Sequence, residues 1–377
     1  MSAINFIGIG LALFLSFLLI QKKKKGTFDF ILLTWLVLNA ILLFFYHLNF
    51  EGRTDQWVPV LIAMSLIPFL LSPLLFIYVS SLVQGERFSW FKQLIHFVPF
   101  IMMVLSMWWF YWLPSDNHVI KVSNGYINVK GQIPFHVKHW SLIMAFSAFI
   151  YPILCLIKIL LHQSIIVNEF SSLKEKTLNW MKYWIVIEFI GFWISFLIII
   201  AGDMDIVDII TSFKIISTLI ITNVFVIGYF GVKQSNIFIG TQDGSFSRQE
   251  SKEKYRHSNL SHLASDELVH ELNNKMRSEK LYRNPTLSAN QVSEFLGITK
   301  HQLSELINKN TSGNFYEYVN QFRIEEFKER VKGGEADNLS LLGLAFDCGF
   351  NSKSTFNHLF KKSEGITPSQ FRKQCFQ

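Results

Sequence analysis

Apolar residues dominate this chain of 377 residues only as far as residue 230. They form seven runs, each near or above the roughly 20 residues with which a helix crosses a hydrocarbon layer of about 30 Å. We therefore expect residues 1–230 to form a seven-span membrane domain. The runs cover about Ile4–Ile20, Phe28–Leu48, Val58–Val83, Lys92–Trp112, His139–Leu161, Tyr183–Ala201 and Ile206–Phe230.

The first run is followed by four lysines, Lys22–Lys25. A signal peptide would carry its positive charge before the apolar region, so we interpret this run as an uncleaved first span. Lysine and arginine prefer the cytoplasmic side of a membrane. With Lys22–Lys25 in the cytoplasm, the loops on that side hold ten Lys and Arg residues, and the loops on the other side hold four. This distribution predicts a multi-pass protein of a bacterial inner membrane, with its N-terminus outside and its C-terminal tail in the cytoplasm.

One outside loop, residues 114–137, is longer than the others. Its segment Lys121–Lys130 alternates apolar and polar residues around Asn124-Gly125, a pair that favours a two-residue hairpin turn. We expect a hairpin there. A ligand-facing lid and a short cap on the helix bundle are equally open interpretations of it.

Residues 231–260 are rich in Gly, Ser and charged residues and show no clear period. Such a segment cannot bury enough apolar surface to fold alone, so we expect a flexible cytoplasmic linker. A flexible chain of this length has an end-to-end distance of about 30 Å. The following residues could then reach partners close to the membrane surface.

From residue 261 onward the apolar positions recur at helical spacing. Short helices that follow a capping Ser or Thr and are separated by glycine are typical of helix-turn-helix units. We predict an all-α fold, in which a seven-transmembrane helix bundle precedes a soluble domain, residues 261–377, of two helix-turn-helix units joined by a long helix. The expected helices are Asp266–Tyr282, Ala289–Leu296, Lys300–Asn308, Phe315–Val331, Leu341–Cys348, one from Asn351 or Ser352 to about Ser363, and a last one opened by Thr367-Pro368.

The two units repeat each other along the sequence. Gly297 and Gly349 lie 52 positions apart, and Leu303 and Phe356 lie 53 positions apart. Many three-helix domains contain one such pattern, whereas two at a fixed offset with one bridging helix are a more specific signal. The arrangement predicts two reading helices about one DNA turn, ~34 Å, apart, which would enter successive major grooves of double-stranded DNA.

The charge distribution supports a nucleic-acid partner only in the last 25 residues, and the cysteines indicate no additional site. After residue 240 there are 19 Lys and Arg against 17 Asp and Glu, a net charge of +2, so net charge alone would not indicate nucleic acid. The last 25 residues are more basic, with five Lys and Arg against Glu364. The three scattered cysteines, Cys155, Cys348 and Cys375, offer no disulfide framework and no metal-site spacing. We expect no metal and no cofactor.

Several stretches of the tail resemble the AraC-type DNA-binding domain, over roughly residues 265–375. The stretches are Leu303–Asn308, Asn314–Ile324, Cys348–Asn357, Phe360–Lys362 and Gly365–Arg372. The membrane part is similar, around Pro73–Val79, to the multi-span sensor region attached to some AraC-type regulators. The resemblance implies a membrane-anchored, sequence-specific DNA-binding transcription regulator whose membrane helices sense a signal.

By their positions in the two reading helices, seven residues would face base edges, where Glu305 could accept a hydrogen bond from cytosine and Asn357 could pair with adenine. The first reading helix lacks arginine and its Glu305 repels phosphate, so we expect the second unit to carry more of the sequence readout. The seven are His301, Ser304, Glu305, Lys353, Ser354, Asn357 and His358. The expected phosphate contacts are Lys300, Lys361, Lys362, Arg372 and Lys373.

Two ionisable residues, Glu188 and Lys214, fall inside predicted spans. A charge at membrane depth is costly and usually faces a partner or a cavity, so the two residues are candidates for an intramembrane signal site. They enter from opposite sides and would lie roughly 10 Å apart along the membrane axis, too far for a direct pair. Lys214 could instead meet Asp205 or Asp208, or extend to the membrane surface.

The expected partners are double-stranded DNA, the lipid bilayer and RNA polymerase, with an unknown signal ligand and a homodimer left open. We expect no enzyme. The spans contain no HxxxH, no HExxH and no paired carboxylates that could support catalysis. A transporter or membrane enzyme with a regulatory DNA-binding tail is the alternative, and an anchor that holds DNA at the membrane is another.

Overall fold

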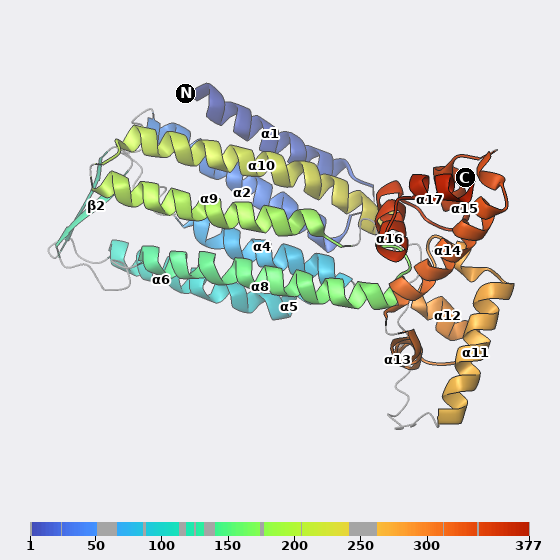
Figure 1. Cartoon of the computed structure of the whole chain (residues 1–377). Coiled ribbons are helices and arrows are strands. Elements are labelled where there is room, and N and C mark those ends of the chain that lie inside the picture. The colour runs from blue at the N-terminus through green and yellow to red at the C-terminus, as the bar shows by residue number, and fades with distance from the viewer. Residues whose placement is uncertain are drawn as a thin grey trace. The chain divides into compact units, whose positions relative to one another are not determined.

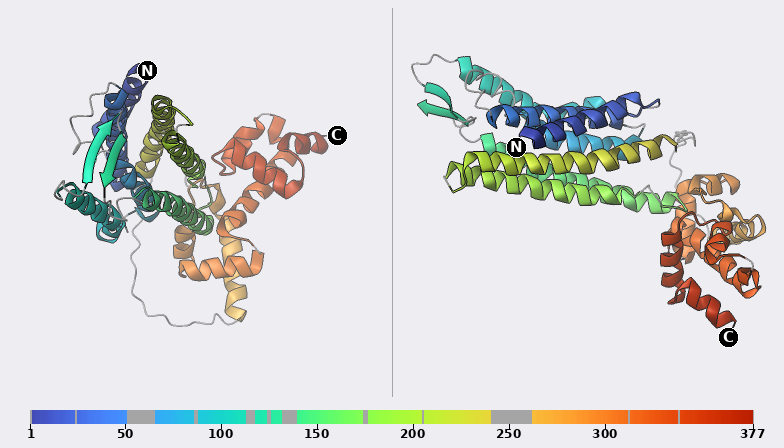
Figure 2. Two further views of the ribbon diagram at one scale, coloured as in Figure 1. Left: turned by 90° about the vertical axis from the view of Figure 1, so that its left-hand side faces the viewer. Right: turned by 90° about the horizontal axis from the view of Figure 1, so that it is seen from above.

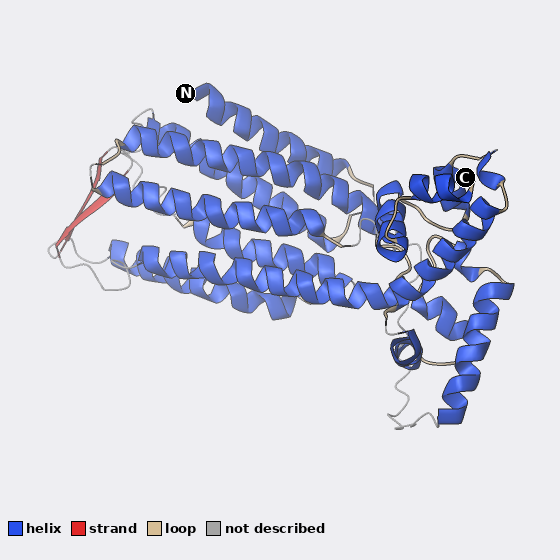
Figure 3. Ribbon diagram, viewed as in Figure 1, coloured by secondary structure: helices blue, strands red, loops and turns tan. Residues whose placement is uncertain are grey.

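The computed structural model describes residues 2–23, 25–50, 66–85, 88–112, 118–123, 126–131, 140–173, 177–204, 206–240, 262–311, 313–337 and 339–376. It divides into two compact units. The first consists of Met1–Leu160 and Leu178–Arg248, and the second of Leu161–Thr177 and Gln249–Gln377. Figures 1 and 3 show that both units are built almost wholly of helices, which confirms the predicted fold class.

The first unit is a bundle of long apolar helices. Seven helices of the described residues are long and apolar enough to cross a membrane, in agreement with the seven predicted spans. The long helices are α1 (Ser2–Gln21), α2 (Thr27–Phe50), α4 (Ile67–Gln84), α6 (Val98–Trp112), α8 (Trp140–Glu169), α9 (Asn179–Asp203) and α10 (Ile209–Gly240). The short helices α5 (Trp90–Gln93) and η2 (Leu94–Phe97) directly precede α6, and the fourth candidate span, Trp90–Trp108, includes α5, η2 and most of α6.

Large apolar side chains cover the outside of this bundle. Phe91 is 87% exposed, and Ile7, Leu105 and Phe146 are each more than half exposed. A continuous apolar surface of this kind is unfavourable in water, and it is the surface that a helix bundle presents to lipid.

Aromatic residues fill the centre of the bundle. The rings of Trp35 on α2 and Trp184 on α9 meet edge to face, with centroids 6.0 Å apart. The indole N–H of Trp184 donates to Asn223 on α10 over 2.7 Å, so its one polar group is satisfied within the apolar core. These contacts join three of the long helices.

A two-stranded hairpin lies in the loop between α6 and α8, where the sequence predicts it. Strands β1 (His118–Ser123) and β2 (Tyr126–Gly131) run antiparallel, with Ser123 opposite Tyr126, and both views of Figure 2 show them. The turn Asn124-Gly125 lies outside the described residues. The hairpin is the one departure from helix among the elements that the structure describes.

Some helix ends differ from the predicted ones. Helix α8 continues to Glu169, eight residues beyond the predicted end of its span, and α10 continues to Gly240, ten residues beyond Phe230. The first residues of the predicted linker are therefore helical. The remainder of that linker, residues 241–260, and the predicted start of the third span at Val58 lie outside the described residues.

The second unit contains the end of α8, the segment after it, and the C-terminal helices. These helices are α11 (His262–Ser278), η3 (Leu281–Arg283), α12 (Ala289–Phe295), α13 (Lys300–Thr311), α14 (Phe315–Lys332), η4 (Glu335–Asp337), α15 (Leu341–Asp347), α16 (Lys353–Glu364) and α17 (Pro368–Cys375). The helix predicted to continue to Tyr282 ends at Ser278 instead. The reason is Lys280, whose left-handed backbone (φ 50°) turns the chain into η3.

Helix α14 belongs to two apolar cores. Its first half, from Phe315 to Phe322, packs with α11, α12 and α13, and its second half, from Ile324 to Val331, packs with α15, α16 and α17. In the second core the ring of Phe327 lies 4.7 Å from that of Phe356. One helix thus joins two helix-turn-helix units, as the sequence predicts.

The turns of the two units have the same backbone hydrogen bonds. Ile298 N–H donates to the carbonyl of Ser293 over 3.0 Å, and Phe350 N–H donates to that of Ala345 over 3.1 Å. Donor and acceptor are both displaced by 52 positions, so the sequence repeat is a repeat of turn geometry. This bond is the one that closes a helix ending in a left-handed glycine.

Candidate nucleic-acid interface

Helix α13 presents an exposed face formed by residues three, four, seven and eight positions apart. His301, Ser304 and Glu305 lie on this face together with Asn308 and Lys309, and the five side chains line a shallow hollow. At 12 residues, α13 is about 18 Å long, a suitable length for a DNA major groove. The structure therefore brings together the three residues expected to read bases in the first unit.

Sequence analysis missed the partner of Glu305. Lys309 Nζ lies 2.6 Å from Glu305 Oε1, one helical turn along. The hydrogen bond and charge of Lys309 hold the pKa of Glu305 below its usual value, so the carboxyl group is ionised at neutral pH. Its repulsion of phosphate is offset by this lysine. The signal in the sequence was the Glu-to-Lys spacing of four.

Helix α16 presents a comparable face in the second unit. Lys353, Ser354, Asn357 and His358 are all exposed, and Lys361 follows one turn later. The apolar residues between them are buried in the second core. The four predicted base-reading residues thus share one open helix face, although their role in reading DNA stays a prediction.

The residues expected to bind phosphate differ in their surroundings. Lys361 and Lys373 are exposed, and Arg372 is half-buried. Lys362 Nζ lies 2.8 Å from Glu317 Oε1 on α14, and its hydrogen bond lowers the pKa of Glu317. Lys300 Nζ lies 2.8 Å from Oε1 of Glu169, the last residue of α8. Lys300 and Lys362 are therefore already paired within the second unit.

Two buried charged residues, Arg323 and Glu326, lie between the cores on α14. Burial favours a raised pKa for Glu326, but hydrogen bonds from Arg283 and Lys280 outweigh it, and the pKa falls below its usual value. Burial lowers the pKa of Arg323 to about 10, which leaves it charged at neutral pH. Nothing in their spacing marked either residue as buried.

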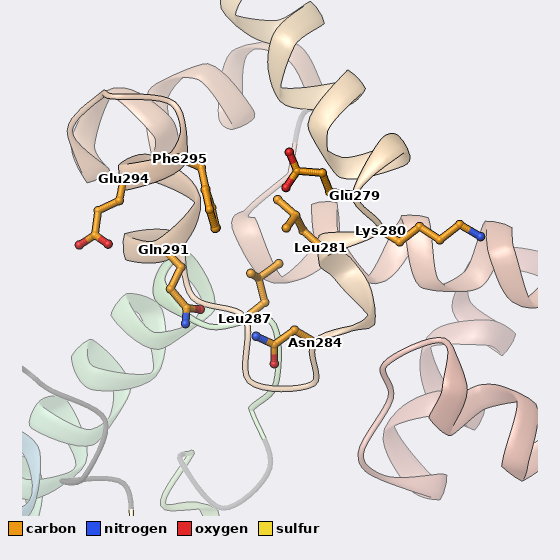
Figure 4. A pocket seen from close by; sticks show the side chains of 8 residues that line it. All are labelled: Glu279, Lys280, Leu281, Asn284, Leu287, Gln291, Glu294 and Phe295. Carbon is orange, nitrogen blue, oxygen red and sulfur yellow. The ribbon is translucent and has the colours of Figure 1, made fainter.

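A separate hollow of about 470 Å³ lies where α11, η3 and α12 meet. Figure 4 shows Leu281, Leu287 and Phe295 close to its centre, with Glu279 beside Leu281 and Glu294 farther out. Carboxylates at its edge disfavour phosphate, so this hollow differs in character from the exposed face of α16, which carries Lys353 and Lys361. Its lining is Glu279, Lys280, Leu281, Asn284, Leu287, Gln291, Glu294 and Phe295.

The structure does not bring Glu188 and Lys214 together as an ion pair among the described residues, and both side chains are partly buried in the first unit. Of the acidic residues proposed as partners of Lys214, Asp205 lies outside the described residues, and Asp208 accepts a hydrogen bond from the backbone N–H of Thr211 over 2.9 Å. Their suggested role as a signal site stays a prediction.

The C-terminal helices of the second unit are similar to those of known proteins. Residues 292–374 match the family described as a helix-turn-helix domain. They form an AraC-type helix-turn-helix domain. An uncharacterized HTH-type transcriptional regulator of Escherichia coli K12, YijO, is 33% identical over 88 residues, which is 23% of this chain and 30% of that protein. The probable transcription factor PqrA of Proteus vulgaris is 29% identical over 98 residues, 26% of this chain and 78% of that protein.

The matched region covers less than a third of the E. coli protein, and the relatives match only about a quarter of this chain. A solved structure of a protein of unknown function from Listeria innocua is 22% identical and covers 28% of this chain and 95% of its own, with a TM-score of 0.25. The family match and the two curated relatives establish homology to transcriptional regulators for the AraC-type domain.

Proposed function

We propose that this chain is a membrane-anchored, sequence-specific transcription regulator. The observation that carries the proposal is the presence, in one chain, of seven helices long and apolar enough to span a bilayer and an AraC-type domain with two exposed reading-helix faces. The Lys and Arg distribution supports an N-terminus outside and a cytoplasmic AraC-type domain.

In this proposal the base edges are read by the exposed face of α13 and, to a larger extent, by that of α16. The α16 face supports this preference because it carries Lys353 and Asn357, which can donate to guanine and pair with adenine respectively. Lys361 and Lys373, both exposed, contact phosphate and fix the register of the domain on the duplex.

The membrane helices would sense a signal, with Glu188 and Lys214 as the candidate residues for a polar ligand. RNA polymerase is the expected protein partner of the DNA-bound domain. A homodimer is not required for sequence reading, because one chain already carries two reading helices.

Selection of DNA from a random pool tests this proposal directly. The full chain, in lipid nanodiscs, would be offered duplexes with a randomised 30-base-pair centre at physiological salt. We expect enrichment of an asymmetric site with two half-sites about 10 base pairs apart. The Lys353→Ala/Asn357→Ala variant should lose this enrichment, whereas Lys332→Ala, an equal loss of charge at the exposed end of α14, should keep it. Retention of duplexes without an enriched sequence would contradict sequence-specific reading.

A further inference from the structure

A short segment of the chain, Glu169–Ser172, is bound on the AraC-type domain within the second unit. We call it the docking segment. It consists of the last residue of α8 and the three residues after it, and Phe170 forms an antiparallel bridge with Ser288. Ser171 N–H donates to the carbonyl of Leu287 over 3.0 Å. The segment is thus held by backbone pairing to the residues that begin α12.

Arg323 holds the centre of the docking segment. The side chain of Arg323 is 1% exposed, and each of its five N–H groups has an acceptor. Two of them donate to Ser171, one to its carbonyl over 3.0 Å and one to its hydroxyl over 3.1 Å. The other three donate to Tyr282, Asn284 and Asn320.

Asn320 adds to this arrangement. Its side-chain amide donates to the carbonyl of Ser171 over 3.1 Å, and the side chain is 2% exposed. Ser171 itself is 1% exposed. A buried guanidinium needs acceptors for all its donors. Without Ser171, two N–H groups of Arg323 would have no acceptor from the domain among the described residues.

The two ends of the docking segment reach the beginnings of both reading helices. Glu169 Oε1 lies 2.8 Å from Nζ of Lys300, the first residue of α13. Ser172 donates to the side chain of Asn351 over 2.9 Å, two positions before α16 begins. N-terminal residues of reading helices are the ones that approach DNA. The segment therefore occupies positions that a DNA duplex would also use.

We propose that the surface formed by Leu287, Lys300, Asn320, Arg323 and Asn351 is a docking site for the docking segment, and that the segment competes there with DNA. The inference rests on the proposed function. A carboxylate of Glu169 and a DNA phosphate cannot both occupy the same position beside Lys300. The competition is reciprocal: docking of the segment weakens DNA binding, and bound DNA weakens docking by the same factor. The segment joins α8 to α9 along the chain, so a change in those helices can bias DNA binding.

Cross-linking in the full chain tests docking and competition together. Ser172→Cys and Asn351→Cys would be combined with Cys155→Ala, Cys348→Ala and Cys375→Ser, which remove the three native cysteines, and a protease site would be inserted within residues 241–261. After cleavage, only a disulfide between residues 172 and 351 keeps the two fragments joined on a non-reducing gel. The protein would be held in nanodiscs of phosphatidylethanolamine and phosphatidylglycerol, with the duplex recovered by selection as the DNA probe.

We expect the cross-link to form without DNA and to form at least about fivefold more slowly when the duplex saturates the protein. The oxidised protein should bind the duplex more weakly than the reduced one. A cross-link that forms equally fast with and without bound duplex would overturn competition, and the lack of a cross-link would overturn docking. If the reduced protein binds no duplex at all, the proposed function itself fails, and the cross-link without DNA still shows whether the segment docks.

A charge variant provides a test without cysteines. Glu169→Gln frees Lys300 and should tighten duplex binding by about two- to fivefold, the size of effect expected for a partly exposed ion pair. Glu271→Gln is the matched control, since it removes one carboxylate from an exposed pair with Lys275 on α11. Equal effects of the two variants on duplex affinity would contradict the proposal, because both change net charge by the same amount.

Discussion

At the scale of single residues, the two turn glycines are equivalent in backbone but differ in surroundings. Gly297 and Gly349 both have positive φ angles, 64° and 98°. A Cβ atom at Gly297 would meet no atom within 4 Å, whereas one at Gly349 would lie 2.4 Å from the carbonyl oxygen of Tyr282. The second turn therefore packs against η3 so closely that only glycine fits.

This difference predicts unequal costs of alanine at the two turns. Gly297→Ala should destabilise the domain by about 1–2 kcal/mol, the cost of a left-handed alanine. Gly349→Ala should cost about 1–3 kcal/mol more, because the backbone of η3 must move. Hydrogen exchange of peptides from α14 in the full chain measures both values. Equal protection of α14 in the two variants would contradict the close packing at Gly349.

The buried Glu326 predicts a dependence of stability on pH. Its pKa in the folded protein is lowered, so its contribution is present above the unfolded pKa of about 4.3 and is lost as pH falls through the folded value. Hydrogen-exchange protection of α14 should fall below about pH 4.3 in the wild type. Glu326→Gln should be less stable at pH 7 and should show a flatter pH profile.

The neighbouring Glu325 supplies the control for this measurement. Its side chain is 41% exposed and lies 3.7 Å from Arg277, so Glu325→Gln should keep both the stability and the pH profile of the wild type. If Glu326→Gln kept the pH profile of the wild type, the loss of hydrogen-exchange protection at low pH would have a source other than Glu326.

At the scale of helices, the exposed face of α16 predicts two kinds of variant. Asn357→Ala should relax sequence preference at one base pair, with a loss of about 1–3 kcal/mol of discrimination. Lys361→Ala should weaken binding to all duplexes alike and lower the slope of log affinity against log salt by about 1. Fluorescence anisotropy with the selected duplex and its single-base variants separates the two. The assignment fails if Asn357→Ala weakens all duplexes equally.

Most helices of the AraC-type domain could be predicted because capping residues next to their ends set their boundaries. Ser288, Ser340, Ser352 and Thr367 each accept a hydrogen bond from the third residue beyond them and begin a helix at the predicted position. The spans could be predicted in number because length and hydropathy alone define them. The end of the first soluble helix could not, since the left-handed Lys280 carries no signal in residue type.

The candidate site was only partly predictable. Helical spacing places His301, Ser304 and Glu305 on one face without knowledge of the fold. The pairs Lys300–Glu169 and Lys362–Glu317 join residues 131 and 45 positions apart, and no local pattern reveals them. Tertiary packing decides which surface cations are already paired.

At the scale of the whole chain, the Lys and Arg distribution predicts the orientation of the spans. Single cysteines at Lys23 and at Lys130, each in a chain without its native cysteines, would be treated with a membrane-impermeant maleimide on intact cells. Lys130→Cys, in β2, should react, and Lys23→Cys should react only after the cells are opened. The reverse pattern would place the AraC-type domain on the wrong side of the membrane for DNA.

The central claim is that the chain reads specific DNA sequences while it is held in the membrane. Chromatin immunoprecipitation with sequencing on the tagged full-length chain, in its own cells, tests this claim most directly. We predict a small number of sharp peaks that persist in Lys332→Ala and disappear in the Lys353→Ala/Asn357→Ala variant, with all three proteins at equal levels in the membrane fraction. Peaks that are identical in the double variant, or no peaks from a full-length chain that is present in the membrane, would contradict it.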